Sequence, residues 1–336
     1  MMWAAWLMLL QGVAGTAERL WGEGRRAEAI EVLVRQVGEE PTNAAAKRRL
    51  VEAEMAVHWY AKALEHAQGL GAEMDAARGT ALFRLGEFER ALGKLPRTSA
   101  DALSMRIEAL EALGKFDDVE TEVAALVKLV GEGDVRAATQ LGRSAARKGE
   151  WPRAEQEFRR ALEREPLDPA AMFGLGQSLV RQGRRDEGLA VLSEHRRITP
   201  LLDQLDFARR SVDLAPMHGP NHAAVGDAER ALGRIERARA AYERAQELAA
   251  PADLAPIALR LARLLADDQQ QNDAAVATLD VAFERCGDVR LLVRASDLLA
   301  QANRTSDALQ RLERAAKLRP GDAEIEKRLR SLRGAK

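Results

Sequence analysis

The hydrophobic and polar positions of this chain follow a pattern of helices separated by regular turns. Ala, Leu, Arg and Glu dominate the segments between the turns, and these residue types favour long helices. No alternating run of β-branched residues, which would indicate a strand, occurs between the turns. Most glycines and prolines fall at regular intervals. The pattern predicts an all-α protein.

The helical segments repeat with a fixed period. Residues 135–168 and 169–200 align with each other at an offset of 34 positions. The matched pairs are Gly142 with Gly176, Gly149 with Gly183, Phe158 with Leu192 and Pro166 with Pro200. Similar residue patterns occur in residues 10–43, 44–71, 72–99, 100–133, 219–250, 256–288 and 289–322. The chain is therefore predicted to be an array of repeats.

The order of residues within a repeat resembles the tetratricopeptide repeat family. In that family a Leu-Gly pair lies on a first helix, and a turn glycine, two alanines, a large apolar residue and a proline follow. The resemblance implies a tetratricopeptide-type α-solenoid, a right-handed superhelix of antiparallel helix pairs. Each pair covers the apolar face of its neighbour, because one pair cannot cover its own. The resemblance extends over nearly the whole chain after Gly15.

We expect this solenoid to have several parts. Residues 18–200 are predicted to form an amino-terminal array, and residues 219–322 a carboxyl-terminal array. Residues 201–218 look like a partial repeat or seam, because the prolines at 200 and 216 bracket one short helical segment. Residues 323–336 are rich in charge and are predicted to cap the array. Pro96 lies closer to the turn of its repeat, residues 72–99, than the proline of other repeats does, so the second helix of this repeat is predicted to be short.

The amino terminus differs from the rest of the chain. Residues 1–17 carry no charge, and residues 3–10 form an apolar run with the length of a signal-peptide core. Small residues follow, so cleavage after Gly15 or Ala17 is possible. Since no Lys or Arg precedes the run, the alternative is that it forms the first repeat helix. A signal peptide here predicts an exported or periplasmic protein; otherwise the protein is expected to be cytoplasmic.

Composition and motifs argue against catalysis. The formal net charge of −1 gives no global field that attracts nucleic acid, and Cys286, the only cysteine, excludes a cysteine-based metal cluster. No phosphate-binding loop or serine-nucleophile elbow occurs. We expect no cofactor, no metal and no stable membrane span. The weakest alternative is an enzyme with a site near residues 195–222, built from His195, His218 and His222.

The resemblance places partner binding in a concave groove lined by the first helices. Arginine forks suit carboxylates, so acidic segments or chain termini are the predicted ligands, unless these arginines only solubilise the surface. The two-carboxylate clamp of chaperone-binding members is not matched, since Ser104, Glu108 and Ala170 occupy its positions. The residues that the resemblance assigns to the groove are Arg136, Thr139, Gln140, Arg143, Arg147, Phe173, Gln177, Arg181, Arg290 and Arg294.

Together these features predict a non-catalytic scaffold that binds peptide segments of partner proteins along its groove. A second hypothesis is an exported assembly factor of the cell envelope or periplasm, and it depends on residues 1–17.

Overall fold

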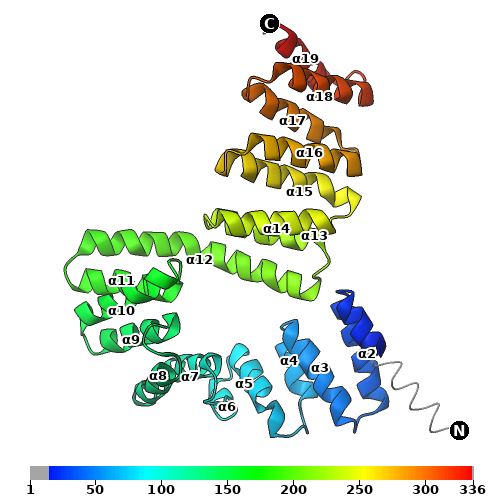
Figure 1. The fold of residues 1–336 in the computed structure, drawn as a ribbon. Helices are drawn as coiled ribbons and strands as arrows, with labels where there is room; N and C mark the ends of the chain where they lie inside the picture. Colours follow the sequence, from blue (N-terminus) through cyan, green and yellow to red (C-terminus); the bar gives the residue numbers. More distant parts are fainter. Residues whose placement is uncertain (1–14, 335–336) are drawn as a thin grey trace, which may run out of the picture. The chain divides into compact units, whose positions relative to one another are not determined.

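The computed structural model describes residues 15–334, and every regular element in this range is helical. Antiparallel helix pairs stack into an α-solenoid, which confirms the predicted fold class (Figure 1). The chain divides into two compact units, unit 1 up to Pro200 and unit 2 from Leu201 onward. Apart from residues 15–17, the predicted signal peptide at residues 1–17 lies outside the described residues.

Unit 1 alternates between first and second helices of successive repeats. The first helices are residues 15–22, α3 (Ala44–Ala56), α5 (Asp75–Arg84, after the 3₁₀ turn η1, Ala72–Met74), α7 (Ala100–Ala112), α9 (Val135–Arg147) and α11 (Pro169–Arg181). The second helices are α2 (Arg26–Glu39), α4 (Tyr60–His66), α6 (Phe88–Leu92), α8 (Phe116–Val130), α10 (Trp151–Arg164) and the first part of α12 (Arg185–Leu214). Helix α6 spans only five residues, as the early Pro96 predicts.

Unit 2 continues the same alternation after the second part of α12. Its helices are α13 (Gly219–Ala231), α14 (Ile235–Leu248), α15 (Pro251–Arg263, extended by the π-helical turn η2, Leu264–Asp268), α16 (Asn272–Cys286), α17 (Val289–Gln301), α18 (Thr305–Leu318) and α19 (Ala323–Gly334). In α19, Ile325 and Leu329 are buried against the core of unit 2, while most of its charged residues are exposed. This arrangement is that of a capping helix, as predicted.

The turn inside each repeat needs a residue with positive φ. Gly149 between α9 and α10 has φ +75°, and Gly183 between α11 and α12 has φ +83°, a region that glycine enters without strain. Three turns use other residues, namely His58 (φ 63°), Gln270 (φ 55°) and Asn303 (φ 59°). Asn303 was predicted, because asparagine tolerates this conformation. His58 and Gln270 were not predicted, although histidine enters this region more often than most residue types.

Pro200 lies inside a helix instead of ending one. Helix α12 runs without interruption from Arg185 to Leu214. Our expectation of a separate short helix at residues 201–215 is therefore wrong. A proline removes one intrahelical hydrogen bond and crowds the preceding turn, but buried side chains can hold the helix together around it. Ile198 and Leu205, on the two sides of Pro200, are both almost completely buried.

A second proline also lies within a helix, at the start of the repeat that we expected at Pro256. Helix α15 begins five residues earlier, at Pro251. Proline at the first helical position loses no intrahelical hydrogen bond, so Pro251 is the residue that begins the helix. Pro256 follows inside it, beside the buried Leu254 and Ile257.

Glycines and aromatic rings interlock where helices cross closely. Phe158 on α10 is 1% exposed, and its ring lies against Gly142 on α9. A Cβ atom on Gly142 would lie only 2.7 Å from Cε1 of Phe158. In unit 2, a Cβ atom on Gly226 would lie 2.6 Å from Cδ1 of Tyr242. These close approaches explain why the Leu-Gly position of a repeat takes a residue without a side chain.

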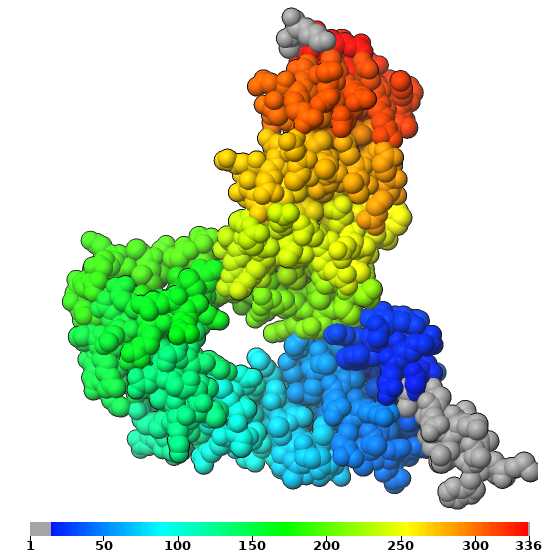
Figure 2. Space-filling view, in the orientation of Figure 1, coloured from blue at the N-terminus to red at the C-terminus, as the bar shows by residue number. Residues whose placement is uncertain are grey.

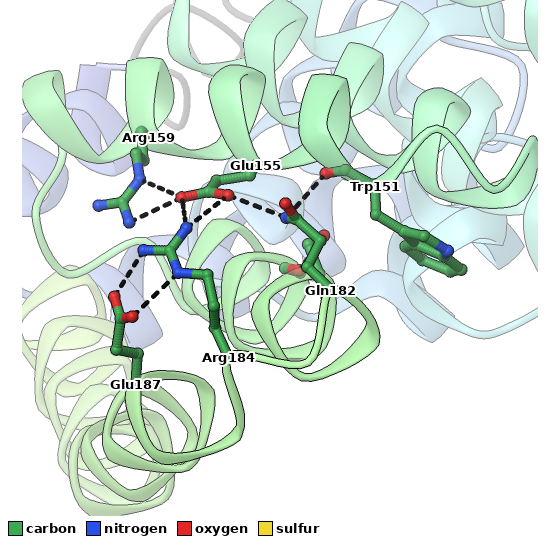
Figure 3. Close-up of polar contacts among 8 residues, drawn as sticks. Trp151, Glu155, Arg159, Gln182, Arg184 and Glu187 are labelled. Atoms are coloured by element: carbon green, nitrogen blue, oxygen red, sulfur yellow. Dashed lines mark hydrogen bonds and ion pairs between the residues drawn. The ribbon is translucent and has the colours of Figure 1, made fainter.

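Polar contacts join neighbouring repeats, and Figure 3 shows one such cluster around Glu155 on α10. Its carboxylate accepts hydrogen bonds from Gln182 Nε2 at 2.9 Å and from Arg184 Nη1 at 2.8 Å, both in the turn after α11. Arg159 Nε, on its own helix, lies 2.9 Å away. Burial alone would raise the pKa of Glu155, but these hydrogen bonds outweigh it and lower the pKa. The ionised carboxylate thus ties α10 to the next repeat.

Candidate binding groove

A groove in unit 1 is lined by the first helices of successive repeats. It encloses about 690 Å³, a size typical of ligand sites, and receives side chains from α5, α7, α9 and α11. Helix α5 packs against α7, and α9 packs against α11. In the space-filling view, unit 1 curves through its cyan and green segments, which include these helices (Figure 2). The lining residues that bear on binding are Ser104, Glu108, Thr139, Gln140, Arg143 and Ala170.

Helix α9 carries half of the predicted residues, of which Arg147 lies outside the groove lining. Thr139 and Gln140 each lie three or four residues from Arg136 and from Arg143, which places all four on one face of the helix. All four line the groove. Asp134 caps the helix by accepting a hydrogen bond from the backbone N–H of Arg136, so the first turn is fixed where it enters the groove.

The arginines of this face are held by carboxylates of the protein itself. Arg136 Nη1 lies 2.8 Å from Asp101 Oδ1 on α7. Arg143 and Arg147 share Glu111, also on α7, with Nη1 atoms 2.8 and 2.7 Å from its two oxygens. These ion pairs link each repeat to its neighbour. An acidic ligand would have to compete with them, and binding of acidic segments stays a prediction.

Three predicted residues of α11 lie outside the groove lining. Phe173, Gln177 and Arg181 are exposed at four-residue spacing. The Phe173 ring is centred 5.5 Å from the His195 ring, and Arg181 Cζ lies 5.7 Å from the centre of the Trp151 ring, within cation–π range. Phe173 and Arg181 thus lie beside aromatic rings of α12 and α10.

The last two predicted residues, Arg290 and Arg294, belong to unit 2. They line a smaller cavity of about 220 Å³ beside α17 and α19. Arg290 Nε lies 3.0 Å from Asp288 Oδ1, and Arg294 Nη2 lies 3.9 Å from Asp267 Oδ1. Both arginines are therefore already close to a carboxylate of their own unit.

Two nearly buried side chains of the unit 1 groove leave a polar atom without a hydrogen bond. Thr139 is 6% exposed and Gln140 is 5% exposed. Neither Oγ1 of Thr139 nor Oε1 of Gln140 has a partner within residues 15–334, and the same holds for the buried Oγ of Ser104 on α7. A buried polar atom without a partner costs about 1–3 kcal/mol, so such atoms are rare unless something else binds them.

Glu108 stands beside these atoms as a carboxylate without a fixed partner. It lies one turn after Ser104 on α7 and is exposed to the groove. In the described part of the chain it forms neither a hydrogen bond nor an ion pair. Partial desolvation by the groove walls raises the pKa of Glu108, whereas the positive charges of Arg143 and Arg84 act to lower it. We did not predict Glu108 as a site residue, although the resemblance had placed it, with Ser104 and Ala170, at positions that the clamp of chaperone-binding members uses.

The histidines of the enzyme hypothesis make ordinary structural contacts. His218 lies before the first turn of α13, as expected, with Nδ1 3.1 Å from Asn221 Oδ1. His222 Nε2 lies 2.8 Å from the carbonyl oxygen of Pro216.

Between residues 15 and 334, no group of three or more His, Cys, Asp or Glu side chains is placed to hold a metal ion. In the same range no helix combines the length and apolar character needed to cross a membrane.

Two segments of the chain match family models of the tetratricopeptide repeat, residues 139–202 and residues 221–251. No curated protein matches the chain by sequence. The first match begins within α9 and includes α10 and α11, and the second covers most of α13 and all of α14. Both matches therefore coincide with helix pairs that the structure shows.

Similar solved structures are also repeat proteins. A thermophilic TPR protein from Thermus thermophilus is 20% identical over 59% of this chain and 98% of its own, with a TM-score of 0.33. A tetratricopeptide repeat protein from Parabacteroides merdae is 17% identical over 76% and 98%, with a TM-score of 0.46. YrrB, a TPR protein with an unusual peptide-binding site, is 17% identical over 62% and 97%, with a TM-score of 0.31.

Proposed function

The chain belongs to the tetratricopeptide repeat family, and from this premise we propose that it is a non-catalytic scaffold that binds peptide segments of partner proteins in the groove of unit 1. Proteins of this family act in protein–protein interaction. The groove of about 690 Å³ offers room for several residues of an extended segment.

The observation that carries this proposal is the set of unpartnered polar atoms in the groove. Thr139 Oγ1 and Gln140 Oε1 are buried without hydrogen bonds in the described residues, at one wall of a cavity that is open to solvent. These atoms expose almost no surface in the free protein, so a ligand can pair with them only after the two side chains rotate toward the groove. The backbone N–H and C=O groups that an extended segment presents at regular intervals could then satisfy them. Leaving these two atoms without hydrogen bonds destabilises the free protein, and a ligand that pairs with them removes this cost on binding.

A groove-filling substitution tests the proposal. Ala170 on α11 lines the groove, and Ala170→Trp places a large ring there. The matched control is Ala190→Trp, because Ala190 is exposed on α12 of unit 1 and does not line the groove. Random peptides of about ten residues, displayed on phage, are selected on the immobilised full chain, and circular dichroism checks the fold of each variant.

We expect the wild type and Ala190→Trp to retain the same peptides, and Ala170→Trp to lose at least about tenfold in affinity, which corresponds to about 1.4 kcal/mol. If both variants retain the peptides equally well, the binding site lies outside this groove. No enrichment of any peptide on the wild type would contradict the proposed function itself.

Export from the cytoplasm is a separate proposal that rests on residues 1–17 alone, which carry no charged side chain. Amino-terminal sequencing of the native protein tests it. A start within a few residues of position 16 or 18 supports export to the periplasm or envelope, whereas an intact Met1 contradicts it.

A further inference from the structure

The charge balance of the unit 1 groove is negative. Its lining holds three arginines and five carboxylates, and two of the arginines, Arg136 and Arg143, are already in ion pairs. Arg84 is the third, and its guanidinium lies 5.9 Å from the centre of the Phe83 ring. The five carboxylates are those of Asp101, Glu108, Asp134, Glu165 and Asp168. A groove with this excess attracts a cationic ligand rather than an anionic one.

Glu108 is the carboxylate best placed to receive such a ligand. Asp134 forms an ion pair with Arg136, and Asp168 accepts a hydrogen bond from the backbone N–H of Ala171 at the start of α11. Glu108 and Glu165 have no comparable contact within residues 15–334, and of these two Glu108 lies on α7, one turn after Ser104. The nearest positive charges are Arg84 and Arg143; neither forms an ion pair with Glu108, and Arg143 is turned toward Glu111.

The neighbouring helix supplies the rest of the site. Thr139 and Gln140 on α9 line the same groove as Ser104 and Glu108 on α7, and all three neutral side chains carry a buried polar atom without a partner in the described chain. A site that combines neutral hydrogen-bonding atoms with one free carboxylate suits an amide backbone with one positively charged side chain.

We propose that the unit 1 groove selects extended segments that contain a lysine or arginine, whose charged group binds the Glu108 carboxylate while the backbone pairs with Thr139 and Gln140. This inference rests on the proposed function, because it names the ligand of the same groove. It replaces the acidic ligand that the arginines suggested, since Arg136, Arg143 and Arg147 are bound by carboxylates of α7 and of the turn before α9.

The test uses the sequences of the peptides that the full chain selects from the random phage library. We expect a lysine or arginine at one shared position. A fluorescein-labelled copy of the best peptide is then titrated by anisotropy against the wild type and two variants. Glu108→Gln removes the charge, and Glu163→Gln is the matched control, because Glu163 is exposed on the second helix α10 without an ion pair in the described chain.

The expected result is a loss of about tenfold or more with Glu108→Gln and a change of less than about twofold with Glu163→Gln. Replacing the basic residue of the peptide by methionine should weaken binding to the wild type as much as Glu108→Gln does. The same peptide replacement should weaken binding to the Glu108→Gln variant only a little further. Binding to the wild type should also weaken as salt is raised. This peptide replacement tests the same contact without altering the protein.

Two results would overturn the inference and leave the proposed function standing. In the first, peptides that depend on the groove, as judged by Ala170→Trp, share no basic residue or share an acidic one. In the second, Glu108→Gln and Glu163→Gln bind the selected peptide equally well. A library that yields no enriched peptide on the wild type contradicts both the inference and the proposed function.

Discussion

Arg106 Nη2 lies 2.7 Å from Glu122 Oε1 in the interior of unit 1, and the two residues join α7 to α8. Both are nearly buried. Arg97 reaches the same carboxylate oxygen at 2.7 Å. Burial alone would raise the pKa of Glu122, but the hydrogen bonds from Arg106 and Arg97 outweigh it and lower the pKa. The folded protein therefore holds Glu122 in its ionised form.

Replacing Glu122 by glutamine is expected to lower the free energy of unfolding by about 3 kcal/mol, because it leaves the buried Arg106 without its counter-charge. Urea denaturation followed by circular dichroism measures the change. Glu163→Gln is the control, since Glu163 is exposed on α10, and it should change stability by less than about 0.5 kcal/mol. Equal effects of the two substitutions would contradict a buried, charged Glu122.

The Glu122 pair also predicts a pH dependence. Because the pKa of Glu122 is lower in the folded than in the unfolded protein, the unfolded chain takes up the proton first as the pH falls. The stabilisation from Glu122 is therefore present above the ordinary glutamate pKa of 4.5 and is lost as the pH falls through the folded pKa. The stability difference between the wild type and Glu122→Gln should shrink below about pH 4.5. A difference that stays constant to about pH 3 would argue against this linkage.

Gly142 should resist replacement by alanine, although alanine favours helices by about 1 kcal/mol over glycine. A Cβ atom there would lie 2.7 Å from the Phe158 ring, which is buried and cannot move aside. We expect Gly142→Ala to lower the free energy of unfolding by about 1–3 kcal/mol. Gly38, on α2, has open space where a Cβ would lie, so Gly38→Ala should be neutral or stabilising. Thermal unfolding compares the two variants.

The periodic parts of the fold were predictable because they depend on local sequence. The turn glycines, the Leu-Gly crossing at Gly142 and the brief helix before Pro96 each follow from backbone sterics at one position. The continuous helix through Pro200 could not be predicted in this way. Its persistence depends on buried neighbours such as Ile198 and Leu205, whose burial is a property of the assembled repeats.

The binding groove was only partly predictable for a related reason. The helical face of Arg136, Gln140 and Arg143 follows from spacing within one repeat, and the structure places these residues in one groove. The partners of their charges lie about one repeat earlier in the sequence, as Glu111 does for Arg143. Which carboxylate faces which arginine depends on the stacking of repeats, so the sequence did not reveal that Glu108 has no partner in the described chain.

The cluster around Glu155 predicts a measurable coupling between repeats. Glu155 is largely shielded from solvent, whereas Arg184 is about two-fifths exposed, so their ion pair is partly screened. We expect Glu155→Ala and Arg184→Ala to show a coupling energy of about 1 kcal/mol in a double-mutant cycle, measured by urea denaturation. The control pair is Arg184 with Glu163, which make no contact within the described residues and should show additive effects. Additivity for Glu155 and Arg184 would contradict the link drawn in Figure 3.

The hydroxyl of Tyr242 predicts an alkaline titration. Tyr242 is 1% exposed, and its Oη donates a hydrogen bond to Asp227 Oδ1 at 2.6 Å. Burial, followed by the contact with Asp227, raises the pKa of this phenol above its ordinary value of 10.0. The stabilising contact is thus intact below about pH 10 and is lost as the pH rises through the folded pKa.

The chain contains two tyrosines, so Tyr60→Phe isolates Tyr242. Absorbance near 295 nm should then show ionisation well above pH 10, together with unfolding followed by circular dichroism. Tyr242→Phe should lower the free energy of unfolding by about 1 kcal/mol, because the exposed Asp227 carboxylate exchanges this hydrogen bond for one with water. Ionisation of Tyr242 at its ordinary pKa in the folded protein would contradict the buried contact.

The proposed binding of a peptide to Thr139 predicts opposite effects of one substitution on stability and on binding. In the described chain its Oγ1 is buried without a hydrogen bond, and valine has the same shape and similar helix propensity. Thr139→Val should therefore raise the free energy of unfolding of the free protein by about 1 kcal/mol. The matched control is Thr278→Val on α16, where Oγ1 already donates to the carbonyl of Ala274 at 2.9 Å and nothing is gained by removal.

The same Thr139→Val variant should bind the selected peptides several-fold more weakly, while Thr278→Val leaves binding unchanged. A change that stabilises the free protein and weakens binding separates a ligand contact from a structural one, since a purely structural residue would lose or gain both together. Urea denaturation and peptide anisotropy on the same preparations measure the two effects. If Thr139→Val is stabilised but binds as tightly as the wild type, the peptide backbone does not reach this hydroxyl, and the bound segment must lie closer to α7.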